Sequence, residues 1–231
     1  KLYKYNSNYI LNYKEILRLI DKNTSIIFLP CPNIPVDTEI DKKILEQILL
    51  VAKKNHIIVA LDEVYFLFTK FNGLKYFQKF KNNLVIMRSF SKAFGLAGIR
   101  LGYLISSKKN IEYISKVRTG YESNTLSIKV AEYFLSNLNI TKKYIFEIKE
   151  GLKYLKEELD KNNIKNFGGL NSNYIFIDFE NMNYKKKIYK KLIKNNIILR
   201  NNWAKPFDKG LLVSGTNKKN MKKLLFILLN K

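Results

Sequence analysis

The sequence predicts an α/β fold: a mostly parallel sheet in a large domain over residues 1–140, followed by a small α+β domain over residues 141–231. Three observations support this prediction. Short, fully apolar runs alternate with amphipathic stretches in the first 110 residues, as in parallel strands joined by right-handed crossovers. Long amphipathic stretches replace that alternation afterwards. At 46% hydrophobic and 13% aromatic, the chain can bury a sizeable core, which excludes a disordered protein.

In the first domain the apolar runs predict four strands, at Ser25–Pro30, His56–Leu61, Leu84–Met87 and Leu101–Ile105. Thr38, with Asp41 three residues later, resembles a capping box and predicts that a helix begins there. Apolar residues at helical spacing follow, so this helix has one buried face.

After about Lys109 the pattern predicts helices at Ile111–Val117 and Ser127–Leu135, still within the first domain, and in the second domain at Lys142–Asn162 and Lys185–Lys194. It predicts strands at Tyr174–Asp178, Ile197–Leu199 and Leu211–Val213. A final helix begins at Thr216 as its N-cap.

The chain is strongly basic, with 42 Lys and Arg against 19 Asp and Glu and a formal net charge of +23. Only five of the basic residues are Arg, although bidentate contacts to phosphates and bases favour Arg. Lys, Asn, Ile, Phe and Tyr, which share codons rich in A and T, dominate the composition, so codon bias explains the excess. We therefore expect no specific nucleic-acid partner, and only non-specific binding that physiological salt abolishes.

Several other classes of protein are excluded. One cysteine, Cys31, and one histidine, His56, rule out a disulfide scaffold and a Cys/His zinc site, and we expect no metal. No apolar run reaches the ~18 to 20 residues of a membrane span. We expect a cytoplasmic protein, although the sequence begins at Lys1 rather than Met, so an N-terminal targeting signal cannot be read.

Polar residues follow the predicted strands at the sheet edge where open parallel sheets bind ligands. Asp62-Glu63-Val64-Tyr65 follows the second strand, and Arg88-Ser89-Phe90-Ser91-Lys92 follows the third. The third segment continues to Tyr103 as Ala-Phe-Gly-Leu-Ala-Gly-Ile-Arg-Leu-Gly-Tyr. This arrangement concentrates an amine, hydroxyl groups and a guanidinium around one spot.

The string Ser89–Tyr103 resembles the cofactor-lysine segment of pyridoxal-phosphate (PLP) aminotransferases of fold type I, class II. With Asp62–Tyr65 upstream and Asn173–Phe176 downstream, the chain looks most like the histidinol-phosphate aminotransferase family from about Asn23 onwards. The resemblance implies PLP as cofactor and a homodimer. It also implies that about a third of the family's chain, preceding this start, is lacking, so that the large domain is incomplete.

Roles follow from the resemblance residue by residue. Lys92 would carry PLP and act as general acid and base. Asp62 would pair with the ring nitrogen and Tyr65 with the phenolic oxygen. Ser89, Ser91 and Arg100 would hold the phosphate, and Asn173 and Arg200 would face the substrate. Glu63 is interpreted as a structural neighbour, and Trp203 and Tyr103 as packing residues.

Two positions depart from the family pattern. Ile34 replaces an Asn that bonds the phenolic oxygen in relatives, and Leu211 replaces an arginine. The resemblance implies transamination between L-histidinol phosphate and 2-oxoglutarate, in histidine biosynthesis. Three alternatives stay open: a threonine-phosphate decarboxylase, an aromatic aminotransferase, and a non-catalytic remnant or basic protein that binds polyanions.

Overall fold

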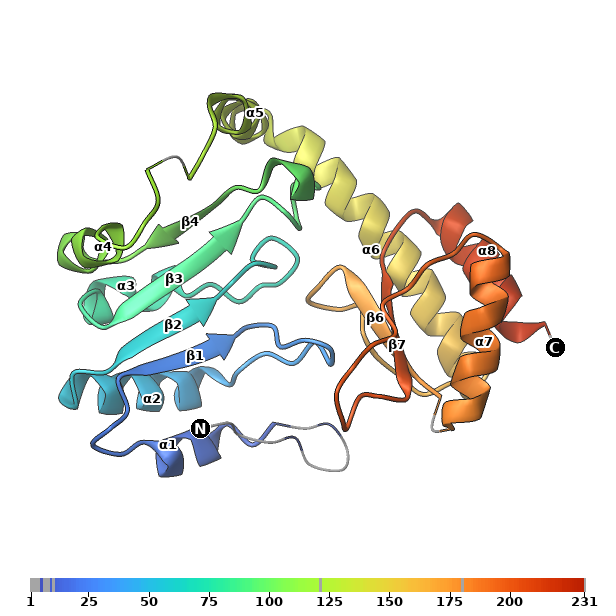
Figure 1. Cartoon of the computed structure of the whole chain (residues 1–231), viewed down its shortest axis with the longest axis horizontal. Helices are drawn as coiled ribbons and strands as arrows, with labels where there is room; N and C mark the ends of the chain where they lie inside the picture. The colour runs from blue at the N-terminus through green and yellow to red at the C-terminus, as the bar shows by residue number, and fades with distance from the viewer. Residues whose placement is uncertain (1–4, 6–8, 10, 121, 180, 231) are drawn as a thin grey trace. The chain divides into compact units, whose positions relative to one another are not determined.

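The computed structural model describes Tyr5, Tyr9 and residues 11–120, 122–179 and 181–230. The chain forms two compact units. Unit 1 comprises residues 1–34 and 38–141, and unit 2 comprises residues 35–37 and 142–231. Their order along the chain can be followed in Figure 1.

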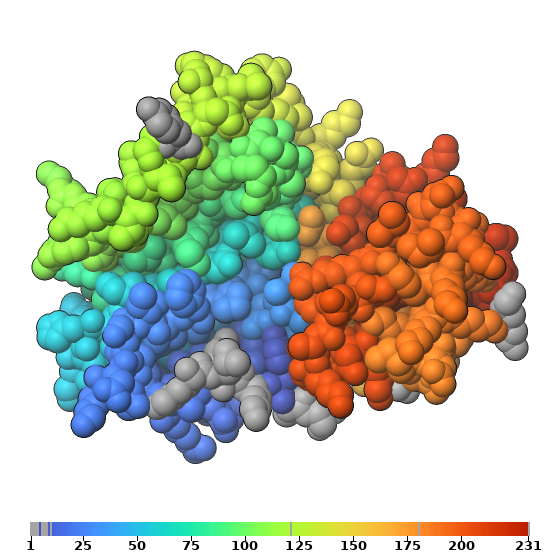
Figure 2. Space-filling view, viewed as in Figure 1, coloured from blue at the N-terminus to red at the C-terminus, as the bar shows by residue number. Residues whose placement is uncertain are grey.

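Unit 1 is built on a four-stranded sheet of order β1-β2-β3-β4. The strands are β1 (Ile26–Pro30), β2 (Ile58–Asp62), β3 (Leu84–Ser89) and β4 (Gly102–Ile105). β1, β2 and β3 are parallel, and β4 returns antiparallel to β3. The predicted mostly parallel α/β fold is thus confirmed, with β4 as the antiparallel member. In the space-filling view the blue, cyan and green segments of unit 1 pack side by side in chain order (Figure 2).

One face of this sheet is covered by α1 (Lys14–Leu19), α2 (Lys42–Lys54) and α3 (Leu74–Phe80) (Figure 1). Side chains that alternate along the strands enter the core on this face because successive residues point to opposite sides of a sheet. They include Leu29, Val59, Leu61, Leu84 and Ile86. We call this side the helix face.

The start of α2 corrects one prediction. Asp41, not Thr38, is the N-cap, and its carboxylate accepts hydrogen bonds from the amides of Lys43 and Ile44. Thr38 instead forms an isolated antiparallel bridge with Asn33, whose amide donates to the Thr38 carbonyl. A carboxylate one residue before the first helical turn satisfies that turn's free N–H groups directly, so the capping box is not needed.

The opposite face of the sheet carries an apolar groove of about 440 Å³. Its walls are Ile26, Phe28, Ile58, Ala60, Val85, Met87, Leu104, Asn110, Tyr113 and Ile114. The last three belong to α4 (Lys108–Ser115), which α5 (Thr125–Ser136) follows along the chain. Phe28 stays 64% exposed, so this groove face is only partly covered within the described residues.

Unit 2 contains an antiparallel sheet of order β5-β6-β7. Its elements are most of α6 (Leu138–Lys161), then β5 (Asn166–Gly168), β6 (Tyr174–Asp178), α7 (Met182–Lys194), β7 (Gly210–Ser214) and α8 (Lys218–Leu229). The strand predicted at residues 174–178 is confirmed.

Two predictions for unit 2 are wrong. The structure forms no strand at Ile197–Leu199; this segment is followed by a single bridge from Arg200 to Leu212. The N-cap of α8 is Asn217, whose side chain accepts from the amide of Asn220, rather than Thr216. The cap is decided by a local contact three residues along the chain, and the segment ending at Arg200 pairs with β7 at one residue only.

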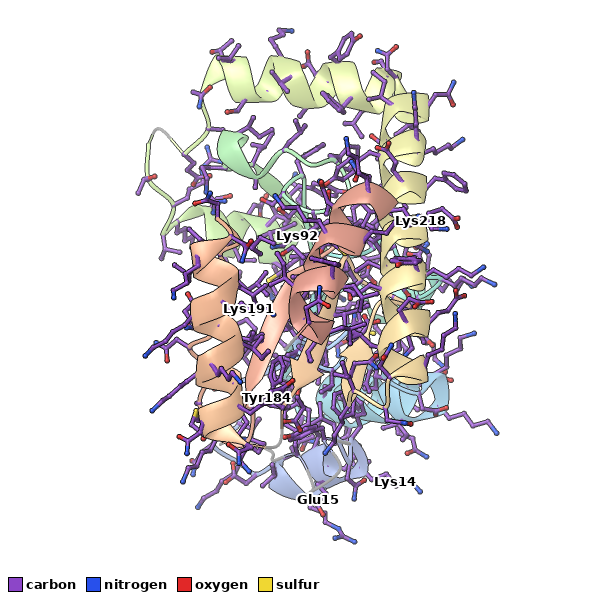
Figure 3. All side chains as sticks on the ribbon, turned by 90° about the vertical axis from the view of Figure 1, so that its right-hand side faces the viewer. Lys14, Glu15, Lys92, Tyr184, Lys191 and Lys218 are labelled. Carbon is purple, nitrogen blue, oxygen red and sulfur yellow. The ribbon has the colours of Figure 1, made fainter. Side chains whose placement is uncertain are left out.

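Lysines occupy the outer surfaces of α7 and α8, represented by Lys191 and Lys218 in Figure 3. The Lys218 ammonium lies 5.2 Å from the centre of the Tyr154 ring. In the part of the chain that the structure describes, no helix combines the length and the apolarity needed to span a bilayer.

Candidate active site

The candidate site lies where the parallel strands of unit 1 end, which we call the carboxyl edge. Asp62 is the last residue of β2, and Ser89 is the last residue of β3. The register pairs Asp62 with Met87, so Ser89 lies two residues further along the neighbouring strand. Asp62 and Ser89 share the strand parity of the groove face, whereas Leu61 and Ile86 belong to the helix face.

Asp62 is a half-buried carboxylate at this edge. Its Oδ1 accepts a hydrogen bond of 3.0 Å from the amide of Val64. Burial raises the pKa of Asp62, whereas this hydrogen bond and the positive charge of Lys92 act to lower it. The ionised form of a buried carboxyl group is costly by itself, and a cationic partner beside it makes that form favourable.

Lys92 reaches the same place from the loop after β3. Its Nζ lies 5.7 Å from the centre of the Tyr65 ring, and Tyr65 itself is buried. The loop is held by a bond of 3.1 Å from the Leu96 amide to the Phe90 carbonyl, and the rings of Phe90 and Phe94 are 4.9 Å apart. The lysine is therefore presented by a packed loop.

Two serines and an arginine lie near Lys92 in the sequence: Ser89 and Ser91 precede it, and Arg100 follows it just before β4. Ser89 Oγ accepts a bond of 3.0 Å from the amide of Ser91. β4 pairs Gly102 with Ser89, which brings Arg100 back to the carboxyl edge. Arg100 has a left-handed backbone (φ 52°), and it is exposed. Its Nη1 donates to the Ala97 carbonyl at 3.1 Å, and a guanidinium has further N–H groups with which it could bind an anion.

The two residues predicted to face the substrate belong to unit 2. Asn173 directly precedes β6, and its carbonyl accepts a bond of 2.6 Å from the amide of Gly215. The Arg200 guanidinium stacks on Trp203 at 3.9 Å from the ring centre. The structure thus brings six of the eight predicted site residues together in unit 1 and describes Asn173 and Arg200 in unit 2.

The two departures from the family pattern have different surroundings. Ile34 is exposed at 37%, while the neighbouring Asn33 is buried and its side chain accepts a hydrogen bond from the Tyr5 hydroxyl. Leu211 is fully buried in β7 opposite Ile177. Position 211 therefore contributes to the apolar core, and an arginine there would bury a charge.

One pair of charged residues at the edge received no functional role from the sequence. Glu63 is fully buried and forms a salt bridge of 2.8 Å with Arg88, whose side chain is 8% exposed. The structural interpretation of Glu63 agrees with this geometry. The sequence shows a charged residue after each of two adjacent apolar runs, which could have suggested an ion pair. Which carboxylate pairs with Arg88 depends on the register of the two strands.

The donor set of unit 1 fits pyridoxal phosphate. Lys92 would supply an amine for its aldehyde, Asp62 a carboxylate for its ring nitrogen, and Tyr65 a phenol for its hydroxyl oxygen. Ser89, Ser91 and Arg100 would supply hydroxyls and a guanidinium for its phosphate. Over the described residues, no group of three or more His, Cys, Asp or Glu could hold a metal ion.

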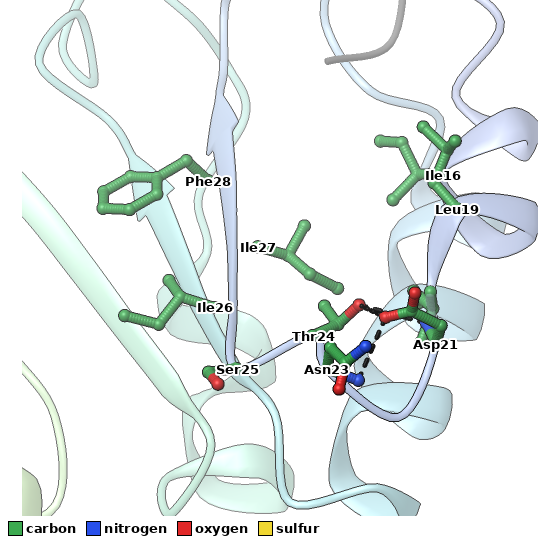
Figure 4. A pocket seen from close by; sticks show the side chains of 10 residues that line it. Ile16, Leu19, Asp21, Asn23, Thr24, Ser25, Ile26, Ile27 and Phe28 are labelled. Atoms are coloured by element: carbon green, nitrogen blue, oxygen red, sulfur yellow. Dashed lines mark hydrogen bonds between the residues drawn. The ribbon is translucent and has the colours of Figure 1, made fainter. Parts of the chain in front are cut away.

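A cavity elsewhere in unit 1 lacks this chemistry. It measures about 600 Å³ and lies between α1 and the amino end of β1 (Figure 4). Ile16, Leu19 and Phe28 line it, and its one carboxylate, Asp21, is occupied by the turn that includes Thr24. Because parallel sheets bind ligands at the carboxyl edge, this cavity is not the candidate site.

The family model of class I and II aminotransferases matches residues 1–224. The histidinol-phosphate aminotransferase of Caldanaerobacter subterraneus subsp. tengcongensis is 32% identical over 197 residues, which are 85% of this chain and 54% of that protein. The Christiangramia forsetii protein of the same name is 31% identical over 220 residues, covering 94% and 61%. The chain thus spans about half to three-fifths of the length of these relatives.

Solved structures share the fold. The histidinol-phosphate aminotransferase from Clostridium acetobutylicum has a TM-score of 0.87 at 24% identity, covering 98% of this chain and 69% of that one. The Sinorhizobium meliloti enzyme, solved with pyridoxal-5'-phosphate, has a TM-score of 0.83 at 19% identity, with 97% and 61% covered. L-threonine-O-3-phosphate decarboxylase from Porphyromonas gingivalis has a TM-score of 0.77 at 19% identity, with 95% and 69% covered.

Proposed function

The chain belongs to the class I and II aminotransferase family, and from this premise we propose that it carries the cofactor site of a PLP-dependent aminotransferase acting on L-histidinol phosphate and 2-oxoglutarate. The names of the sequence relatives support histidinol phosphate as substrate over the alternatives. The fold alone does not separate a transaminase from a threonine-phosphate decarboxylase, because both have high structural similarity to this chain.

When bound, pyridoxal phosphate supplies an aldehyde that condenses with amines and a ring that accepts electrons. Lys92 would hold the cofactor through its Nζ, and the same amine would act as the base that accepts the proton from the substrate's α-carbon. Asp62 keeps the ring nitrogen protonated. Tyr65 donates to the phenolic oxygen.

Ser89, Ser91 and Arg100 bind the phosphate and so fix the ring over the carboxyl edge. Such an anchor would keep the cofactor within reach of Lys92. Ser91 and Lys92 are adjacent in the same loop, so phosphate binding by Ser91 and the position of the Lys92 amine are coupled.

In this proposal, unit 1 is the large, cofactor-binding domain and unit 2 the small domain. Arg200 binds the anionic group of the substrate, and the flat face of Trp203 keeps its guanidinium in one plane. Asn173 contributes a side-chain amide for orientation. We infer a homodimer from the family resemblance.

The observation that carries the proposal is the meeting of Lys92, Asp62 and Tyr65 at one edge of the sheet. The test is to incubate the protein with PLP, reduce it with borohydride, and map the labelled peptide. We expect the label on Lys92, and none in Lys92→Ala. Lys81→Ala, which removes an exposed lysine of the same unit, is the matched control and should label as the wild type does. Label on another lysine would refute the assignment.

Substrate choice needs a separate measurement. Transamination of L-histidinol phosphate should exceed that of phenylalanine and tyrosine, and no carbon dioxide should form from threonine phosphate. Carbon dioxide release would instead assign the decarboxylase alternative.

A further inference from the structure

A buried ion pair lies directly behind the candidate site. Both Arg88 Nε and Nη2 donate to Glu63 Oε2, at 2.9 and 2.8 Å. The other oxygen, Oε1, accepts from the amide of Gly73, and Arg88 Nη2 also donates to Asn72 Oδ1 at 2.9 Å. The guanidinium lies 4.4 Å from the centre of the Phe66 ring. Each charged group therefore has several directional partners.

The pair occupies the helix face, on the opposite side of the sheet from Asp62. A Cβ added to Gly73 would lie 2.5 Å from both Glu63 Oε1 and a methyl carbon of Leu61, a core residue. Glu63 and Arg88 each stand next in sequence to a proposed cofactor ligand, Asp62 and Ser89. The ion pair therefore joins the ends of β2 and β3, the two strand ends that carry Asp62 and Ser89.

Backbone hydrogen bonds make the same connection. The Glu63 amide donates to the Met87 carbonyl at 2.9 Å, and the Cys31 amide donates to the Asp62 carbonyl at 2.9 Å. The β2–β3 ladder therefore continues one residue past the end of β2, where neighbouring strands usually separate into loops. A side-chain ion pair at this position helps to keep that last backbone hydrogen bond formed.

Stability alone gives little reason to keep such a pair. Removing two charges from water is expensive, and apolar side chains of similar volume often replace a buried ion pair without loss of stability. Burial raises the pKa of Glu63, and the bonds from Arg88 oppose that shift. What an apolar pair cannot supply is the directional fork that defines one relative position of the two strand ends.

We propose that Glu63 and Arg88 are positioning residues that hold Asp62 and Ser89 at the separation required by the ring nitrogen and the phosphate of the cofactor. The proposal rests on the proposed function for the identity of the cofactor. It assigns the pair no contact with cofactor or substrate.

The experiment compares four proteins: the wild type, Glu63→Gln, the apolar double variant Glu63→Leu with Arg88→Met, and the control Glu46→Gln. Glu46 forms an exposed ion pair of 2.6 Å with Lys79 in the same unit, away from the carboxyl edge. Three quantities are measured: the urea midpoint, amide hydrogen exchange of Cys31, Glu63 and Val64, and PLP affinity from the visible absorbance of the bound cofactor and its pH dependence.

We expect at least tenfold faster exchange at the three amides and at least tenfold weaker PLP binding in Glu63→Gln. The apolar double variant should recover much of the urea midpoint but neither the exchange protection nor the PLP affinity. Glu46→Gln should match the wild type in all three. A recovered urea midpoint without recovered exchange protection or PLP affinity would distinguish a positioning role from a purely structural one.

Wild-type exchange protection and PLP affinity in the apolar double variant would overturn the proposal, because the pair would then only stabilise the fold. If the wild type takes up no PLP, the proposed function fails, and hydrogen exchange still decides the positioning role of the ion pair. Unchanged protection in both variants overturns it, and faster exchange confined to the edge amides supports it. The double variant also keeps the test valid if Glu63→Gln alone does not fold.

Discussion

Asp62→Asn should change cofactor affinity and protein stability in opposite directions. The substitution keeps the size of the side chain, and the Asn Oδ1 can still accept the 3.0 Å bond from the Val64 amide. The second carboxylate oxygen, which we assign to the ring nitrogen of PLP, is replaced by the NH2 group of an uncharged amide.

The expected loss follows from that one interaction. A hydrogen bond to a charged group contributes about 1.5 to 3 kcal/mol, which corresponds to a roughly 10- to 150-fold weaker affinity for PLP. The cofactor-free protein should become more stable, because burial raises the pKa of Asp62 and its ionised form is therefore unfavourable in the folded state.

The pH dependence has a defined sign. A carboxyl group whose pKa is raised on folding binds its proton more tightly in the native state. Below its unfolded pKa of about 3.9 it costs no stability, and the cost appears as the pH rises through the folded pKa. The stability advantage of Asp62→Asn should therefore be largest near neutral pH and disappear in acid.

The assay combines urea unfolding of the cofactor-free protein at several pH values with PLP titration followed by absorbance. Asp41→Asn is the control, since Asn caps a helix about as well as Asp and position 41 is exposed at the start of α2. Unchanged PLP affinity in Asp62→Asn would refute the assignment of the ring-nitrogen partner. A lower neutral-pH stability would refute the electrostatic argument.

Three further predictions concern other parts of the molecule. Arg200→Met should raise the Michaelis constant for the phosphorylated substrate by one to two decades, since about 1.5 to 3 kcal/mol of charge-assisted binding is lost while the contact with Trp203 stays apolar. Gly151→Ala should destabilise the protein by about 2 kcal/mol in urea unfolding, because its Cβ would lie 1.8 Å from the carbonyl oxygen of Thr216. Cys31 should react with a thiol reagent only after unfolding, because it is fully buried and burial raises the pKa of its thiol to about 12.

Each of these has a contrary outcome. An unchanged Michaelis constant in Arg200→Met would mean that another cation binds the substrate. Gly98→Ala, where nothing lies within 4 Å of the added Cβ, is the control for Gly151→Ala, and equal effects would exclude the steric explanation. Rapid modification of Cys31 in the folded protein would show that its site opens readily.

The sequence predicted the parallel strands because a strand buried on both faces must be apolar throughout. Ile58–Asp62 and Leu84–Ser89 carry that signature, and each ends where polar residues begin. The helix starts at Asp41 and Asn217 were displaced from the predictions because several adjacent side chains can cap a helix, and the backbone path decides which of them reaches the free amides.

The candidate site divides in the same way. The sequence by itself determined which groups are available, since the segments around Asp62, Tyr65 and Lys92 resemble the cofactor-binding motifs of a known family. The tertiary structure decided how they are supported. The bond between Glu63 and Arg88 joins residues 25 positions apart, and the burial of Leu211 depends on β6 beside it. Periodicity along a chain reports which face a residue shares with its neighbours, but a contact between strands depends on their register, which only the folded packing fixes.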